Sequence, residues 1–181
     1  MKPKKAPKDY TEKFHSSDEP LTIEMQPIGV VYSPFKERFA APRQPDLHAP
    51  ATATIELHRG SNFEQALSDL DSFSHIWVIY WMHLNQGWNP TVMPPRGSKV
   101  RRGLFSTRAP HRPNSIGLSV VKLNRVHKRT LYIEGLDMLD GTPVLDIKPY
   151  LPYADAVPDA SHGWLDPDAP FLFSASDLKR E

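Results

Sequence analysis

A run of aromatic and β-branched residues at 74–84 is the clearest hydrophobic pattern in the chain, and polar residues bound it on both sides. Such a run predicts a buried central strand. Apolar and polar positions alternate over 51–57, which predicts another strand, and one more is expected over 23–32, interrupted or bulged at Pro27. Further short strands are expected near 102–106, 115–124, 130–136 and 144–148.

Helical spacing of apolar residues marks one segment, at Phe63, Ala66, Leu67 and Leu70. Ser61 and Glu64 have the spacing of a capping box, so a helix is expected from about residue 62 to residue 70. Many short strands, one helix and 19 prolines together predict a mostly-β domain, either a barrel or a sandwich.

The length of 181 residues fits one domain. Residues 1–20 are polar, rich in lysine and without hydrophobic periodicity, so they are expected to form a disordered tail. The domain is expected to occupy residues 21–160, and residues 161–181 to form a C-terminal extension.

The chain has no cysteine, which excludes disulfide bonds and thiolate metal sites. Its apolar runs fall short of the ~20 residues needed to span a bilayer. Its charged N-terminus lacks the apolar stretch of a secretory signal. These features predict a cytoplasmic protein with no membrane partner.

The charge is distributed unevenly although its total is only +1. Residues 96–129 contain ten Lys and Arg residues and no Asp or Glu, whereas residues 137–181 are mainly acidic. Such asymmetry can focus positive potential on one face, which predicts an anion-binding surface. The alternative is that these charges are solvated and paired across the fold.

Several common chemical motifs are absent from the sequence. It has no glycine-rich phosphate loop, no G-x-S-x-G nucleophile elbow and no H-E-x-x-H zinc helix. The eight histidines are scattered, and His75 and His83 lie too far apart on one predicted strand to chelate one ion directly. No metal site is therefore expected.

Three polar segments rich in proline or glycine carry the candidate chemistry, at 33–44, 103–119 and 135–155. The first offers donors at Arg43 and Gln44, and taken alone it is typical of an ordinary surface loop.

The second segment runs from a predicted strand into a rigid turn that carries Arg108, Arg112 and Asn114. Arginine presents a planar fork of donors suited to carboxylate or phosphate, and asparagine can pair with the edge of a base. Gly117 within a predicted strand indicates a bulge or the close approach of a ligand.

The third segment contains the turn signal Asp140-Gly141, followed by Asp146 and Lys148 in a predicted strand. Residues two apart in a strand share a face. Asp146 and Lys148 therefore form either a solvated edge or a buried pair at a site.

Together the segments carry three long motifs: Pro42-Arg43-Gln44, then Arg108-x-Pro110-x-Arg112-Pro113-Asn114-x-Ile116-Gly117-Leu118, then Asp137-x-x-Asp140-Gly141-Thr142-Pro143-x-x-Asp146-Ile147-Lys148-Pro149-Tyr150. In this order, over residues 27–153, the chain resembles the TsaA-like family, also called YaeB or TrmO. The family pattern usually has proline where this chain has Ser115. Bacterial members also carry an extra C-terminal domain, whereas about thirty residues follow Tyr153 here.

The resemblance implies a small single-sheet β-barrel with one or two short helices, assembled as a homodimer. It also implies S-adenosylmethionine as cofactor and methylation of N6-threonylcarbamoyladenosine beside the anticodon of threonine tRNAs. The cofactor contacts that it implies are Pro42, Arg43, Gln44, His83, Leu84, Arg108, Leu118, Met138, Leu139, Asp140 and Gly141.

Methyl transfer to a weakly nucleophilic nitrogen benefits from a positioned proton acceptor. The catalytic candidates are Asp137, Asp140 and Asn114. The RNA-binding candidates are Arg112, Lys148, Arg101 and Arg102. Other open interpretations are a methyltransferase acting on another RNA or a small molecule, a non-catalytic module that binds S-adenosylmethionine, and a metal hydrolase.

Overall fold

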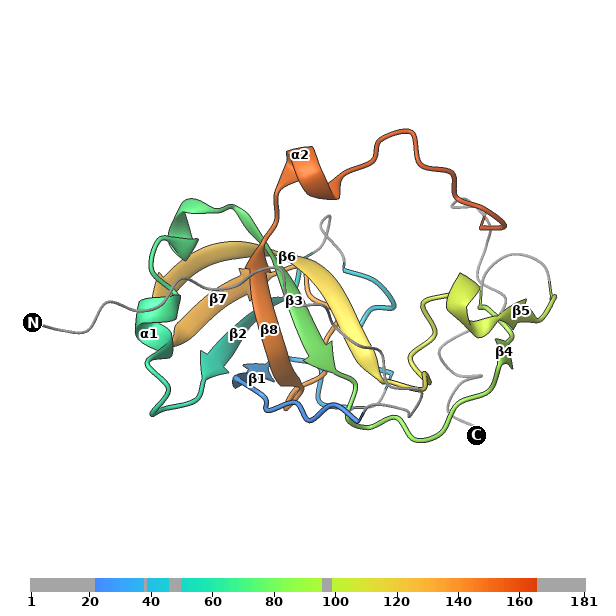
Figure 1. Cartoon of the computed structure of the whole chain (residues 1–181), viewed down its shortest axis with the longest axis horizontal. Helices are drawn as coiled ribbons and strands as arrows, with labels where there is room; N and C mark the ends of the chain where they lie inside the picture. Colours follow the sequence, from blue (N-terminus) through green and yellow to red (C-terminus); the bar gives the residue numbers. More distant parts are fainter. Residues whose placement is uncertain (1–21, 38, 46–49, 96–98, 166–181) are drawn as a thin grey trace, which may run out of the picture.

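The computed structural model describes residues 22–37, 39–45, 50–95 and 99–165, and six of its strands close into a barrel in the order β1-β2-β7-β6-β3-β8 (Figure 1). Every neighbouring pair is antiparallel, including the pair β1–β8 that closes the barrel. The barrel strands are β1 Gly29–Tyr32, β2 Thr52–Leu57, β3 His75–Trp81, β6 Ile116–His127, β7 Thr130–Glu134 and β8 Pro143–Pro149. The predicted mostly-β barrel is therefore confirmed.

Alternate side chains of each strand fill the barrel, because successive residues of a strand point to opposite faces. In β3, Ile76 and Val78 are fully buried and Tyr80 is nearly so, whereas Trp81 lies on the outside. The other strands contribute Val31, Ile55, Val121, Leu131, Ile133 and Val144 to the same core. The run at 74–84 is apolar at consecutive positions because both the inner and the outer face of β3 carry apolar side chains.

Three of the predicted strands differ from the expectation. The strand expected over 23–32 with a bulge at Pro27 is limited to β1, Gly29–Tyr32, so Pro27 lies before it. Strand β6 extends to His127, three residues beyond the predicted end, and pairs with β3 along seven residues. Of the segment 102–106, Arg102–Gly103 forms β5 and Leu104–Ser106 forms the 3-10 helix η2. A two-residue strand β4, Thr91–Val92, pairs with β5 and was not predicted.

The predicted helix over 62–70 was wrong in length and in its cap. Helix α1 is the single turn Phe63–Ala66, and the short helix η1 follows at Leu70–Ser72. Asn62 and Asp69 both adopt left-handed backbone conformations, with φ of 54° and 66°, which ends helical geometry on either side. No capping-box hydrogen bond forms within this described segment.

Helix α2, Pro152–Asp155, follows β8, and residues 156–165 then arch away from the barrel toward η2 (Figure 1). Within the described part of the chain, no helix combines the length and the apolar character that membrane crossing requires. The predicted disordered tail and most of the predicted C-terminal extension lie outside the described residues.

Candidate functional site

Three connections between barrel strands meet at one end of the barrel, called here the site end. They are 33–51 after β1, 82–115 after β3, and 135–142 after β7. Since neighbouring strands are antiparallel, alternate connections of this chain lie at the same end. The three motifs, distant in sequence, are brought together in this way.

The connection 135–142 crosses the barrel opening at the site end. Leu136 and Met138 are each 1% exposed and close the hydrophobic core. Backbone hydrogen bonds hold both ends of the connection, from Gly135 N to Ala51 O (3.0 Å) and from Gly141 N to Val31 O (2.9 Å). The polar residues at 137 and 140 are therefore presented from a fixed segment.

Asp140 has a structural part in this arrangement. Its Oδ1 accepts a hydrogen bond from Ser33 N at 2.9 Å, and its Oδ2 lies 2.6 Å from Lys36 Nζ. The hydrogen bond from Lys36, followed by that from Ser33, lowers the pKa of this carboxyl. A carboxylate with both oxygens engaged and a lowered pKa is a weak proton acceptor.

Asp137 has the opposite environment. Its Oδ1 accepts a hydrogen bond from Ser119 Oγ at 2.6 Å, and Ser119 Oγ lies 3.3 Å from the hydroxyl of Tyr80. Burial raises the pKa of Asp137, and burial followed by the charge of Asp137 raises the pKa of Tyr80 to about 12. Of the two predicted catalytic carboxylates, Asp137 is thus the one poised to accept a proton.

Gly117 allows Tyr80 to reach this cluster. The two residues are cross-strand partners, and a Cβ at position 117 would lie 2.2 Å from ring atoms of Tyr80. The close approach expected at Gly117 is therefore made by a side chain of the same chain. The alternative expectation, a bulge at Gly117, is not met, because β6 pairs with β3 there without a register shift. In the described strands the register shifts lie between Ile79 and Tyr80 against β8 and between Leu123 and Arg125 against β7.

Arg108 connects the first two motifs. Its Nη1 donates to Gln44 Oε1 at 2.7 Å, across 64 residues of sequence. Its charge also acts on Asp137, where it lowers the pKa against the effect of burial. Arg108 therefore links Gln44 of the first segment to the catalytic candidate Asp137 of the third, and Pro42 and Arg43 directly precede Gln44.

The predicted apolar contacts lie at the rim of the site end. Leu84 and Leu118 are 49% and 54% exposed, and the ring of His83 lies 6.2 Å from that of Trp81. Leu118 points away from the core, because its neighbours Gly117 and Ser119 are the inward positions of β6. Exposed apolar side chains therefore border the polar cluster.

The predicted RNA-binding arginines have partners, which lie within the 82–115 connection for Arg101 and Arg112 and outside it for Arg102. Arg112 Nη1 donates to Thr107 O at 3.1 Å and Ala109 O at 3.4 Å. Arg101 donates to the side chain and carbonyl of Thr91, and the guanidinium of Arg102 lies 5.1 Å from the centre of the Trp164 ring. These contacts shape the connection itself. Asn114 is exposed in the same connection.

Lys148 lies far from the site end. It pairs in register with Trp77, five residues along β8 from Pro143, or about 16 Å. Its ammonium group lies 2.7 Å from Asp146 Oδ2, and both side chains are well exposed. Asp146 and Lys148 are therefore a solvated pair on the outer surface, the first of the two predicted alternatives.

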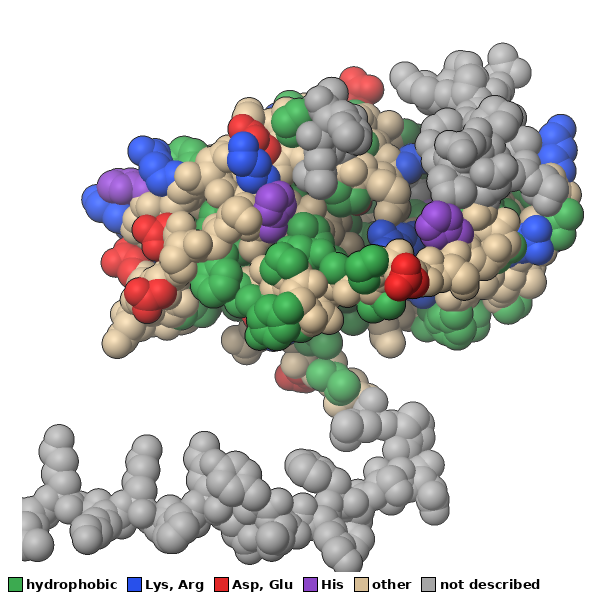
Figure 2. All heavy atoms as spheres, turned by 90° about the horizontal axis from the view of Figure 1, so that it is seen from above, with side chains coloured by type: hydrophobic (Ala, Val, Ile, Leu, Met, Phe, Trp, Pro, Cys, Tyr) green, Lys and Arg blue, Asp and Glu red, His purple; other side chains and the backbone are tan. Residues whose placement is uncertain are grey.

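The basic run is divided between the two ends of the barrel. Strand β6 carries the chain across the barrel, so Arg101 and Arg112 lie near the site end and Arg125 and Arg129 toward the other. On the face drawn in Figure 2, Lys and Arg side chains are concentrated toward opposite ends of the long axis, with acidic side chains among those on the left.

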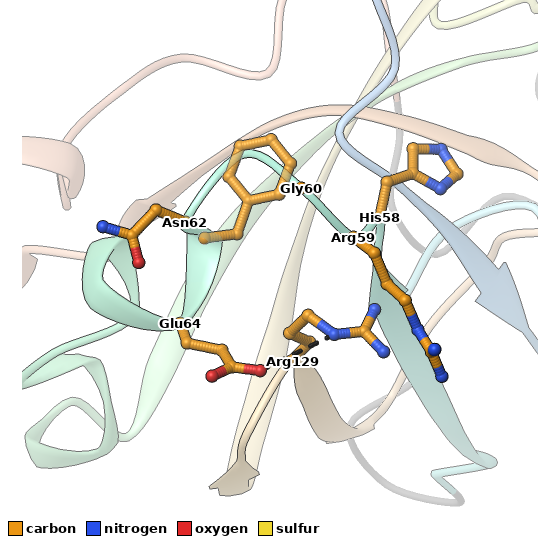
Figure 3. A pocket seen from close by; sticks show the side chains of 7 residues that line it. His58, Arg59, Gly60, Asn62, Glu64 and Arg129 are labelled. Carbon is orange, nitrogen blue, oxygen red and sulfur yellow. Dashed lines mark ion pairs between the residues drawn. The ribbon is translucent and has the colours of Figure 1, made fainter.

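The end opposite the site end contains a cavity of about 390 Å³. Figure 3 shows Glu64 and Arg129 directed toward each other there, with Glu64 Oε1 3.7 Å from Arg129 Nε. Arg129 also donates to Leu57 O. The cavity is lined by His58, Arg59, Gly60, Asn62, Phe63, Glu64 and Arg129. Arg129 thus joins α1 to the β6–β7 hairpin.

Tyr80 and Ser119 are site residues that the sequence patterns did not single out. Ser119 alternates with Gly117 and Val121 at inward positions of β6, so a polar residue at a core position was the available signal. In the described ranges, no group of three or more acidic or histidine residues lies close enough together to hold a metal ion.

The chain matches the family described as the tRNA-methyltransferase O N-terminal domain over residues 30–156. It is 46% identical over 147 residues to a tRNA (adenine(37)-N6)-methyltransferase of Escherichia coli K12, covering 77% of this chain and 63% of the relative. A probable S-adenosyl-L-methionine-binding protein of Pyrococcus abyssi is 40% identical over 158 residues, with coverage of 87% and 84%.

A crystal structure of TrmO from Pseudomonas aeruginosa superimposes with a TM-score of 0.68 at 45% identity, covering 79% of this chain and 62% of that one. The chain spans 62–66% of the length of three bacterial relatives. Since the match takes in most of the chain and both barrel and motifs agree with it, the protein belongs to the family of the tRNA-methyltransferase O N-terminal domain.

Proposed function

We propose that this chain is an S-adenosylmethionine-dependent methyltransferase that acts on N6-threonylcarbamoyladenosine beside the anticodon of tRNA. The observation that carries the proposal is the meeting at the site end of a partly buried carboxylate, Asp137, with the hydrogen-bonded pair Arg108 and Gln44. A relative that is 46% identical is a tRNA (adenine(37)-N6)-methyltransferase, which supports the same reaction class.

The donor set at the site end suits S-adenosylmethionine. Arg108 and Gln44 offer a cation and an amide to a carboxylate, and the exposed Leu84 and Leu118 offer apolar surface to an adenine ring. The backbone of residues 138–141 is fixed nearby and offers further polar groups. When bound, this cofactor supplies an electrophilic methyl group on a sulfonium.

Asp137 would accept the proton that the substrate nitrogen loses. Its raised pKa makes it a better base than an ordinary aspartate, while Asp140 is engaged by Lys36 and Ser33. Asn114, exposed in the 82–115 connection, remains a candidate for contacting the modified base.

The RNA backbone would approach the arginines of the 82–115 connection. Arg112 and Arg102 lie over the rings of Phe105 and Trp164, which fixes their positions while leaving charge for phosphates. Threonine tRNAs remain the proposed isoacceptors. This substrate would place the protein in the cytoplasm.

We also propose a homodimer. Ile79 pairs with Leu118, and Trp81 with Ile116, on the outer face of β3 and β6. Trp81, Ile116 and Leu118 are 47%, 40% and 54% exposed, so they form an apolar strip that a second copy would cover. Light scattering should find a dimer that Ile116→Glu dissociates, and a monomeric wild-type protein would refute this assembly.

The competing function is a non-catalytic module that binds the cofactor. The Pyrococcus relative, which this chain covers over 84% of its length, is described as a probable S-adenosyl-L-methionine-binding protein. The two functions share the Arg108–Gln44 pair and differ in whether Asp137 is needed.

The test is incubation with labelled S-adenosylmethionine and total tRNA from cells with and without the threonylcarbamoyl modification, followed by nucleoside mass spectrometry. Label in the modified tRNA alone, and its loss in Asp137→Asn with cofactor binding retained in calorimetry, is expected. Cofactor binding without label in any RNA would favour the binding module.

A further inference from the structure

We propose that Tyr80 and Ser119 are positioning residues, which orient the Asp137 carboxylate so that it accepts the proton of the substrate nitrogen. This inference rests on the proposed methyltransferase function. It assigns a role to two buried hydroxyl groups inside the barrel.

The direction of the hydrogen bonds follows from the number of protons. A carboxylate only accepts, so Ser119 Oγ uses its single proton on Asp137 Oδ1, at 2.6 Å. The hydroxyl of Tyr80 lies 3.3 Å from Ser119 Oγ and also hydrogen-bonds to Asp137 itself. Both hydroxyl groups are therefore donors toward the carboxylate in this cluster.

The pair gives a residue outside the strands a rigid support. Asp137 lies in the 135–142 connection, whereas Tyr80 and Ser119 stand on neighbouring strands, β3 and β6, and are 8% and 2% exposed. The ring of Tyr80 is in turn seated against Gly117. Catalytic geometry is most precise where rigid elements and a second layer of hydrogen bonds support the reacting group.

The same pair moderates the basicity of the carboxylate. Burial raises the pKa of Asp137, and the hydrogen bonds from Ser119 and Tyr80 and the charge of Arg108 oppose that rise. On the described elements around it, Tyr80 and Arg108 are the titratable or charged groups that act on Asp137. A base more basic than a free aspartate suits proton removal near neutral pH.

The chemical step balances without another reactant. The lone pair of the acceptor nitrogen forms the new N–CH₃ bond, and the electrons of the broken C–S bond stay on sulfur. The N–H proton moves to the Asp137 carboxylate, which later releases it to water.

The experiment compares Ser119→Ala and Tyr80→Phe with controls that remove or alter hydroxyl groups elsewhere. Ser72→Ala removes a hydroxyl of η1 that donates a hydrogen bond to Asp69 O. Tyr132→Phe removes the hydroxyl of a tyrosine in β7 whose ring packs against Arg125. For each variant, kcat and KM for modified tRNA are measured against pH, and the Asp137 carboxyl is titrated by ¹³C NMR without substrate.

We expect Ser119→Ala to lower kcat about five- to thirtyfold with little change in KM, because one hydrogen bond to a charged group is lost. The acid limb of its kcat profile should move to higher pH, since Ser119 stabilises the ionised form. Tyr80→Phe should act in the same direction and less strongly. Ser72→Ala and Tyr132→Phe should match the wild type.

If the wild type is active and both cluster variants match the controls, the positioning role is wrong while the methyltransferase function stands. If the wild type methylates no RNA, the proposed function fails, and the NMR titration still decides about the cluster. If the Asp137 carboxyl titrates at higher pH in Ser119→Ala than in the wild type, the hydrogen bond from Ser119 to Asp137 is confirmed. An unchanged titration overturns the positioning role of Ser119.

Discussion

An alanine at position 117 would bring its Cβ to 2.2 Å from two ring carbons of Tyr80, far inside van der Waals contact. The ring cannot retreat inward, because Tyr80 is 8% exposed and packs in the barrel core. The strand at 117 is paired with Tyr80 itself, so the backbone has little freedom to move. We predict that Gly117→Ala displaces the ring and breaks its contact with Ser119.

The cost combines two effects. Overpacking a core of this kind typically costs ~1–3 kcal/mol, and losing the hydrogen bond of Tyr80 adds about 1 kcal/mol. A total of about 2–4 kcal/mol corresponds to a decrease in Tm of roughly 5–15 °C for a chain of this length. Scanning calorimetry and urea denaturation measure both quantities.

Gly103→Ala is the matched control. Its Cβ would have Ser106 Oγ as its nearest neighbour, at 4.0 Å, and its backbone lies outside the left-handed region. Its stability should stay within about 0.5 kcal/mol of the wild type. In the double variant Tyr80→Leu/Gly117→Ala, removal of the ring should recover at least ~1 kcal/mol relative to additivity. Equal stabilities of Gly117→Ala and Gly103→Ala would refute the packing argument.

Three further predictions concern Tyr80, Asp137 and Trp164. Ultraviolet titration should show one tyrosine, Tyr80, ionising near pH 12. The stability that its raised pKa contributes is fully present below the pKa of tyrosine in the unfolded chain and is lost as the pH rises through about 12. Ionisation of all tyrosines together near pH 10 would contradict this. Because the folded pKa of Asp137 is raised, its charge opposes folding at neutral pH, so Asp137→Asn should be more stable than the wild type in urea at pH 8 and indistinguishable from it near pH 3. Trp164→Ala removes the bond to Ser106 O and the ring beneath Arg102, so amide exchange in β5 and η2 should accelerate about three- to tenfold while the β6–β7 hairpin is unchanged.

Strand positions followed from the sequence because the barrel interior imposes an alternation that its residues display, as in β2. The length of the helix did not follow from the sequence, because it depends on the left-handed backbone of Asp69, which the spacing of apolar residues does not reveal. Motif resemblance identified Asp137 and Asp140 alike. Only their surroundings separate them, since Lys36 and Ser33 engage one while Ser119 and burial act on the other.

The convergence of the motifs follows from topology alone. In an antiparallel barrel entered at β1, the first, third and fifth connections must lie at one end and the others at the opposite end. The first, third and fifth connections here are 33–51, 82–115 and 135–142, which carry Gln44, Arg108 and Asp137. The same rule places the hairpin at Lys128 at the far end. The rule that assembles the site therefore also divides the basic run between the two ends, a placement that follows from connection order and cannot be read from charge counted along the sequence.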